Sequence, residues 1–361
     1  MNRVTSTALL LLPALLGLSG CAAGTYRTAD ISQDPELVHI QFKSLQDAYT
    51  LFDGIKMVID PETKTLGWDA TGVRWAGIKS IEFEDGKTFS AGYYRSFLHR
   101  APNSTIQVEF PGGHKYAAIV DTDFPVHIVL TSDIVVANEL PIYPFEDRPL
   151  QGACRIGELK VGSARVRDVA GAYREEQWQF RILGRPVYKH PVVFLGLPFM
   201  ASFDYVAFDN VAQEVTFSKD GAFEPDDAEQ WTSYPFEIKP DLNGNDKLMV
   251  QMPVAGQVCE LSFASCGDNP GLHLSRDMWD DLSQPMRVEK QRQTTHYWYQ
   301  TGVLPCEIAT VAELSLGPKT IANAEVLIPD DPERLSLVSL GYFQDTVVVL
   351  DFVNKLMWIR S

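Results

Sequence analysis

The sequence predicts a mainly β protein built from two related halves. Short runs in which apolar and polar residues alternate recur between turn residues from residue 36 onward, and helical candidates are few and short. Alternation of this kind is typical of half-buried strands, because successive strand side chains point to opposite faces of a sheet. A series of features within residues 104–219 also recurs about 145 residues later, within residues 246–361.

The composition excludes several classes of protein. The 31 Lys and Arg residues against 47 Asp and Glu residues give a net charge of −16, which disfavours a nucleic-acid partner. With 45% hydrophobic and 11% aromatic residues, the chain is not disordered throughout. No apolar run reaches the roughly 20 residues that a membrane-spanning helix requires.

The N-terminus has the pattern of a secretory signal peptide. Arg3 precedes the apolar stretch 8–18, and small residues follow it. The tetrad Leu18-Ser19-Gly20-Cys21 resembles the lipobox of bacterial lipoproteins, which implies removal of residues 1–20 and lipidation of Cys21. No Asp follows Cys21, so the resemblance favours the outer membrane, facing the periplasm. An ordinary cleaved signal or a short anchor helix, with Cys21 incidental, is the alternative.

Export would permit disulfide bonds among the remaining cysteines, Cys154, Cys259, Cys266 and Cys306. Four cysteines allow three pairings, and buried unpaired thiols are an equally good interpretation. The chain has no C-x-x-C spacing, so a structural zinc site is not expected. We expect no cofactor.

Several elements can be placed along the chain. Small, polar residues at 21–35 fit a tether, and residues 36–103 form a β-rich N-terminal extension. The turn residues 111–113 predict a hairpin. Hydroxyls at Ser44 and Ser275 are placed to cap helices. The expected strands are 38–42, 72–75, 78–83, 105–110 and 116–120, and the expected helices are 45–52 and 276–282.

The internal repeat links two loops and two later glycine steps. A strand-turn-strand unit runs into Asp121-Thr122-Asp123, and its counterpart runs into Ser265-Cys266-Gly267. Further on, Gly196 and Gly341 each lie between apolar residues and precede a strand that ends in Asp, at Asp209 and Asp351. The common order and spacing indicate duplication of one unit.

These features resemble the aspartic proteases of the retropepsin and pepsin type. In that family a strand ends in Asp-Thr-Gly in each lobe, which Ile119-Val120-Asp121-Thr122 matches, and an apolar-apolar-Gly step passes behind the catalytic loop. The resemblance implies a mainly β, two-lobed, acid-protease-like fold, a double retropepsin-like β-barrel. Lobe 1 would span residues 104–225 and lobe 2 residues 226–361. Asp121 and Thr122 would be the catalytic motif of lobe 1.

Hydrolysis in that family needs two carboxylates that share one proton across a water molecule. The repeat spacing places Ser265 where the second Asp is expected, and Asp123 where the family has Gly. We therefore expect a catalytically degenerate protein that binds a peptide or protein segment between its lobes. The alternative is an active endopeptidase in which Asp123, Asp268 or a second chain supplies the other carboxylate. The oligomeric state is left open.

Several further features allow both a purely structural and a functional interpretation. Asp121-Thr122-Asp123 also spells D-x-D, a divalent-metal pattern in some transferases, although no phosphate-binding loop accompanies it. His127 and His273 lie in apolar runs at matching places, and we expect them to be core residues. The stretch 294–300 falls where the family's flap hairpin would lie in the second lobe, and an ordinary amphipathic hairpin is an equally good interpretation. Arg287, Lys290 and Arg292 form a basic cluster expected to face solvent.

Overall fold

The computed structural model describes residues 58–59, 66–69, 72–73, 78–94, 104–140, 142–145, 148–174, 179–182, 185–189, 191–241, 246–266, 270–284, 286–298, 302–331 and 334–361. Within these ranges no helix is both long enough and apolar enough to cross a membrane. Several predicted features lie outside the described residues: the signal peptide, Cys21, the tether, strand 38–42, helix 45–52, Gly267 and Asp268.

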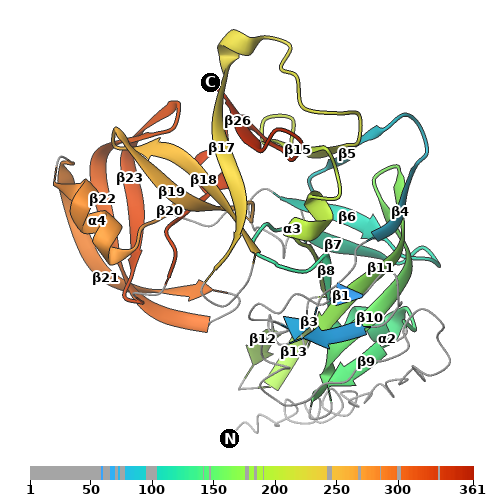
Figure 1. Ribbon diagram of the computed structural model, residues 1–361. Helices are drawn as coiled ribbons and strands as arrows, with labels where there is room; N and C mark the ends of the chain where they lie inside the picture. Colours follow the sequence, from blue (N-terminus) through green and yellow to red (C-terminus); the bar gives the residue numbers. More distant parts are fainter. Residues whose placement is uncertain are drawn as a thin grey trace, which may run out of the picture.

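The fold is mainly β and has two lobes, with the strands of lobe 1 and lobe 2 on opposite sides of Figure 1. The elements of lobe 1 are β4 (Ile78–Phe83), β5 (Thr88–Gly92), β6 (Thr105–Glu109), β7 (Lys115–Val120), β8 (Ile128–Thr131), α2 (Ser132–Ala137), β9 (Ile142–Phe145), β10 (Arg148–Val161), β11 (Ala164–Arg174), β14 (Val192–Leu195), α3 (Leu197–Met200), β15 (Tyr205–Asp209) and β16 (Glu214–Ser218). Those of lobe 2 are η2 (Ala228–Gln230), β17 (Trp231–Pro240), β18 (Asp246–Val254), β19 (Gln257–Ala264), β20 (Leu272–His273), α4 (Arg276–Ser283), β21 (Val288–Trp298), β22 (Gly302–Leu316), β23 (Lys319–Pro329), β24 (Leu337–Ser339), η3 (Leu340–Tyr342), β25 (Val347–Asp351) and β26 (Leu356–Arg360).

The two lobes repeat one succession of elements. In each, an antiparallel hairpin leads into a loop, a short strand and a short helix. Three strands joined by two antiparallel hairpins follow, and then a second short strand and a helical turn. The pairings repeat as well, because β14 is parallel to β7 and antiparallel to β8, while β24 is parallel to β19 and antiparallel to β20. The duplication predicted from the sequence is therefore present in the topology.

A sheet shared by both lobes joins them, in the strand order β17-β26-β25-β15-β16-β5. At its centre β15 pairs antiparallel with β25, with Ala207 opposite Val349. The hairpins that follow these strands begin alike: Asp209 Oδ1 accepts hydrogen bonds from the backbone N–H groups of residues 211 and 212, and Asp351 Oδ1 from those of residues 353 and 354. A pseudo-twofold axis thus passes between β15 and β25.

Part of the predicted N-terminal extension belongs to lobe 1. Strand β4 pairs with β11, and β5 pairs with β16 at the edge of the shared sheet. Phe89 of β5 stacks on Phe217 of β16, with ring centroids 5.1 Å apart. The first strands of lobe 1 therefore precede residue 104.

Several predicted elements are confirmed. Strand 78–83 is β4, and strands 105–110 and 116–120 correspond to β6 and β7, joined by the predicted turn. Helix 276–282 corresponds to α4, and the Ser275 hydroxyl caps it by accepting a hydrogen bond from the Met278 N–H. Burial alternates along β15, the predicted strand that ends at Asp209, as expected for a strand with one face in the core.

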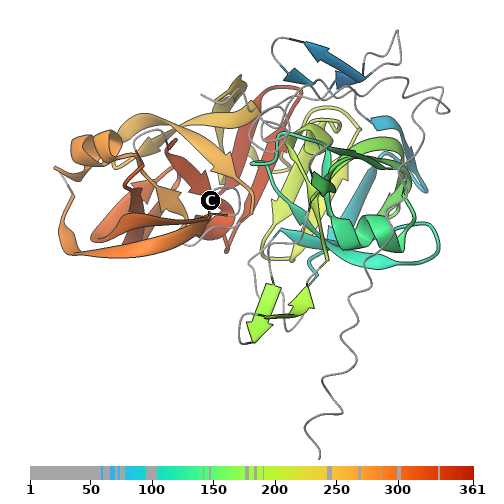
Figure 2. The ribbon, with the colours of Figure 1, turned by 90° about the horizontal axis from the view of Figure 1, so that it is seen from below.

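Two small sheets stand apart from this repeat. Strands β1 (Val58–Ile59), β2 (Leu66–Asp69) and β3 (Gly72–Val73) form one, and the hairpin of β12 (Gln179–Ile182) and β13 (Arg185–Lys189) forms the other. Figure 2 shows the β12–β13 hairpin, in yellow-green, projecting from lobe 1.

Candidate functional site

The loop of lobe 1 begins where β7 ends. Asp121, next after Val120, is buried, with 6% of its surface exposed. Its backbone N–H donates to Leu195 O at 2.9 Å, which fixes the loop to β14. Its Oδ1 accepts a hydrogen bond from the backbone N–H of Asp123 at 2.9 Å. The carboxylate of Asp121 is thus held in place by its own loop.

The loops of the two lobes meet through reciprocal hydrogen bonds. The Thr122 N–H donates to Ser265 Oγ, and the Ser265 N–H donates to Thr122 Oγ1, each at 3.0 Å. Each hydroxyl also donates across the interface: Thr122 Oγ1 to Phe263 O, and Ser265 Oγ to Val120 O. Both side chains are buried, so this network joins the lobes at their centre.

The network also sets the register between the two motifs, and it differs from the sequence alignment by one residue. Thr122 contacts the carbonyl before Ala264, and Ser265 contacts the carbonyl before Asp121. Ser265 is therefore the counterpart of Thr122, 143 residues away. Ala264, fully buried, is the counterpart of Asp121. The predicted alignment placed Ser265 opposite Asp121 because no acidic residue marks the second motif.

The glycine steps show a similar shift. Val120 pairs with Leu195, and Phe263 pairs with Val338, so Ser339 rather than Gly341 is the counterpart of Gly196. A Cβ on Gly196 would lie 2.0 Å from Val126 O, which explains why glycine is needed there. In lobe 2 the glycine that permits the close approach lies instead in the loop that leads into β20.

That glycine is Gly271, which directly precedes β20. A Cβ on Gly271 would lie 2.7 Å from Tyr342 N. The glycine thus directly follows β14 in lobe 1 but directly precedes β20 in lobe 2. In both lobes a backbone segment packs closely behind the loop, but the glycine that permits this packing is at a different position in each.

A lysine from lobe 2 crosses to the loop of lobe 1. Lys247 Nζ lies 3.0 Å from Asp123 Oδ1 and 3.2 Å from Asp123 O, and only 12% of its side chain is exposed. Burial lowers the pKa of Lys247, but the nearby carboxylates of Asp123, Asp241 and Asp121 outweigh burial and hold that pKa above its usual value. Lys247 is therefore a cation at neutral pH, held against Asp123, at the position where the protease family has glycine.

Cys266 follows Ser265 and lies beside the same carboxylates. Its Sγ and one oxygen each from Asp121 and Asp123 lie within 4.8 Å of one another. This spacing would suit a metal ion, but a metal would have to compete with the Lys247 ammonium for Asp123. The distances between the possible ligand atoms thus support the D-x-D interpretation, whereas the Lys247 ammonium beside Asp123 opposes it. Gly267 and Asp268, beyond Cys266, are outside the described residues.

The described cysteines form no disulfide. Cys154, Cys259 and Cys306 are buried thiols, and Cys266 is partly exposed. Of the two interpretations that the sequence left open, the structure has unpaired thiols. Burial raises the pKa of Cys154, Cys259 and Cys306, so these three are poor nucleophiles.

The two histidines are buried, as expected, but they are not counterparts. Ile128 pairs with Leu195 and Leu272 with Val338, so His127 corresponds to Gly271. Burial lowers the pKa of His127 to about 4. His273 has a pKa lowered to about 3, by burial and by nearby positive charge. Both imidazoles are neutral at pH 7.

The described part of the predicted flap stretch, residues 294–298, lies on β21, which pairs with β22. His296 of β21 contacts His273, with ring centroids 5.3 Å apart in an edge-to-face arrangement. The basic residues Arg287, just before this strand, and Lys290 and Arg292, on it, are exposed, in agreement with a solvent-facing cluster.

Sequence reasoning missed two residues of this site. Ala264 carries no chemical signal, and only the reciprocal hydrogen bonds identify its position. Lys247 lies 124 residues from its partner Asp123, and no local pattern distinguishes it from a surface lysine.

Twin loops that exchange hydrogen bonds across a pseudo-twofold axis, between two β lobes, define an acid-protease-like fold. Three solved structures share similarity with it. They are basic 7S globulin from soybean (TM-score 0.42, 10% identity, 76% of this chain and 94% of that chain), conglutin gamma from lupine seeds (0.43, 9%, 77% and 95%) and edgp (0.41, 9%, 76% and 94%). No protein-family model and no curated protein sequence matches the chain.

Proposed function

We propose that this protein is a catalytically inactive relative of the acid-protease fold that binds a peptide or protein segment at the interface of its lobes. The observation that carries this proposal is Ala264, which occupies the position symmetric to Asp121. An alanine neither takes up nor releases a proton. A water molecule beside Asp121 would have one carboxylate where the reaction uses two.

The Asp123–Lys247 pair supports the same proposal. Hydrolysis by a carboxylate dyad requires one of the two groups to stay protonated, and two like charges in close contact provide that proton sharing. A protonated lysine 3.0 Å from Asp123 favours the ionised carboxylate instead. The charged pair also occupies space that a glycine would leave to a bound chain.

We further propose that the protein is exported and held by lipid on Cys21 at the outer membrane, facing the periplasm. The lipobox-like tetrad and the absence of Asp after Cys21 support this. A single acyl chain anchors a protein only weakly, whereas the several chains of a lipoprotein anchor it firmly. Fractionation of cells that express the protein is expected to place it in the outer membrane, and Cys21→Ser to release it.

Incubation with an unfolded substrate protein tests the catalytic part of the proposal. Across pH 3 to 7, with and without pepstatin, we expect no cleavage by the purified protein. Cleavage that pepstatin inhibits and that Asp121→Asn abolishes would overturn the proposal. Binding is tested separately, by the fluorescence anisotropy of labelled casein. Asp123→Arg is expected to weaken binding, and Asp226→Arg, a matched exposed control, to leave it unchanged.

An active endopeptidase is the second candidate, and one observation favours it. Oxygens of Asp121 and Asp123 lie within 4.8 Å, so two carboxylates are close, although both come from lobe 1. In that case Lys247→Met would raise the rate of cleavage, because it removes the cation that keeps Asp123 ionised. For the metal alternative, calorimetric titration with Mg²⁺, Mn²⁺ and Zn²⁺ is expected to give no heat of binding.

A further inference from the structure

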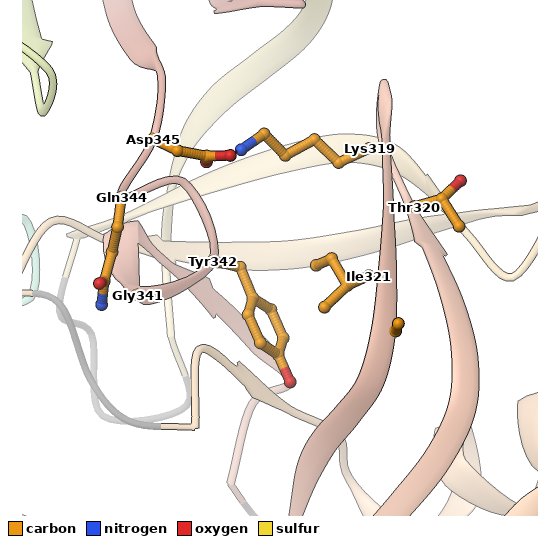
Figure 3. A pocket seen from close by; sticks show the side chains of 8 residues that line it. Lys319, Thr320, Ile321, Gly341, Tyr342, Gln344 and Asp345 are labelled. Atoms are coloured by element: carbon orange, nitrogen blue, oxygen red, sulfur yellow. The ribbon is translucent and has the colours of Figure 1, made fainter.

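A hollow lies in lobe 2, between strand β23 and the chain segment 341–345. Its volume is about 480 Å³, within the range of roughly 300–1,000 Å³ that is common for ligand sites. Figure 3 shows the strand on one side and Tyr342, Gln344 and Asp345 on the other. The lining residues are Lys319, Thr320, Ile321, Ala322, Gly341, Tyr342, Gln344 and Asp345.

One wall of this hollow is an open strand edge. Strand β23 pairs with β22 from Lys319 to Pro329, but on its other side it pairs with β20 only at Val326 and Leu327. Among the described strands, none lies beside residues 319–325 on that side. Backbone N–H and C=O groups on an unpaired edge are a template for another strand.

Two contacts hold the opposite wall at a distance from this edge. Lys319 Nζ donates to Asp345 Oδ1 at one end of the hollow, and the Tyr342 hydroxyl donates to Glu325 O at the other. Burial raises the pKa of Tyr342, so its hydroxyl remains a donor at physiological pH. Tyr342 also packs on Gly271, where a Cβ would collide with it. These two hydrogen bonds therefore connect the walls at the two ends of the hollow.

We propose that this hollow binds an extended, uncharged peptide segment that adds to the edge of β23 as an extra strand. An extended peptide backbone has alternating N–H and C=O groups that can pair with the unpaired groups of a strand edge. Strand addition derives its affinity from these main-chain hydrogen bonds. The charged residues among the eight described lining residues, Lys319 and Asp345, form a neutral ion pair, so these residues offer no net charge to a charged ligand. Ile321 points from β23 toward Tyr342 and supplies an apolar contact.

A capped peptide with high strand propensity tests the proposal with the full-length protein. The probe is acetyl-Val-Thr-Val-Thr-Val-amide, titrated calorimetrically, alongside the same peptide methylated on alternate backbone nitrogens. We expect the unmodified peptide to bind and the methylated one to bind at least about tenfold more weakly, because methylation removes main-chain donors. Ala322→Trp fills the hollow and is expected to abolish binding.

Two variants serve as controls. Ala212→Trp places the same bulk at an exposed alanine of the β15–β16 hairpin and is expected to leave binding unchanged. Lys247→Met alters the interface of the lobes and is also expected to leave it unchanged, which separates this site from the proposed inter-lobe site. The proposal is overturned by absence of binding up to millimolar peptide, by equal binding of the methylated peptide, or by retained binding in Ala322→Trp.

Discussion

Thr122 and Ser265 lie 143 residues apart, yet each donates its backbone N–H to the hydroxyl of the other at 3.0 Å. This exchange ties the two lobes together at their centre and identifies corresponding residues in the two motifs. A duplicated protein retains the exchange as long as each lobe supplies one hydroxyl. The residue before each hydroxyl takes no part in this exchange, and in lobe 2 that residue is Ala264.

Removing the Ser265 hydroxyl is expected to destabilise the protein. Ser265→Ala leaves the Thr122 N–H and Val120 O without their buried side-chain partner, which costs about 1–3 kcal/mol of unfolding free energy. Urea denaturation measures this loss. Ser265→Thr keeps the hydroxyl and should retain most of the stability, and Ser90→Ala, an exposed hydroxyl, should change little. Equal stability of Ser265→Ala and the wild type would contradict the role of the exchange.

Gly196 is expected to tolerate no side chain. Gly196→Ala places a Cβ 2.0 Å from Val126 O and 2.6 Å from Phe124 O, both of them backbone atoms. The backbone must move, at a cost of about 3 kcal/mol or more. Gly157→Ala is the control, because a Cβ there meets nothing within 4 Å. Thermal unfolding should show a large drop for the first variant only, and a similar drop for both would count against the steric explanation.

Lys247 is expected to stabilise the fold at neutral pH and to stop doing so in strong alkali. Its pKa in the folded protein lies above its ordinary value, so its contribution is complete below about pH 10.4 and is lost as pH rises through the folded pKa. Lys247→Met should lower the unfolding free energy by about 1–3 kcal/mol, because Asp123 loses a charged partner. A double-mutant cycle with Asp123→Asn isolates the pair. Additive losses would show that the two side chains do not interact.

His127 is expected to make the protein sensitive to acid. Its pKa falls from an ordinary 6.5 to about 4 on folding because burial disfavours the charged form. The stability linked to its neutral form is present above pH 6.5 and is lost as pH falls toward 4, by roughly 3 kcal/mol. His127→Gln should flatten the dependence of unfolding free energy on pH in this interval. His114→Gln, at an exposed site, should not.

Restoring the second carboxylate is expected to create activity. Ala264→Asp places a carboxylate at the position symmetric to Asp121, and combining it with Asp123→Gly and Lys247→Gln removes the charged pair. This triple variant should cleave an unfolded substrate at acidic pH in a pepstatin-sensitive manner. Adding Asp121→Asn should abolish that cleavage. If the wild-type protein cleaves as fast as the triple variant, Ala264 is not the defect that we infer.

The strand pattern and the duplication could be predicted because their signals are local. Ile106 and Val108 alternate with polar residues along β6, and the Ser275 hydroxyl stands directly before the helix that it caps. The register of the two motifs could not be predicted in the same way. The second motif lacks its acidic residue, so nothing local marks its position. Aligning Gly341 with Gly196 gave the wrong register, because the counterpart of Gly196 is Ser339 and the glycine that permits close packing in lobe 2 is Gly271.

By itself the sequence determined a mainly β chain of two related halves with Asp121 at the end of a buried strand. Alternation, turn residues and repeat spacing act over a few residues or recur in order, so they are visible without coordinates. Only the tertiary structure decided that Ala264 corresponds to Asp121 and that Lys247 neutralises Asp123. Both facts depend on which atoms of one lobe come within hydrogen-bonding distance of the other, and that is set by the packing of the lobes.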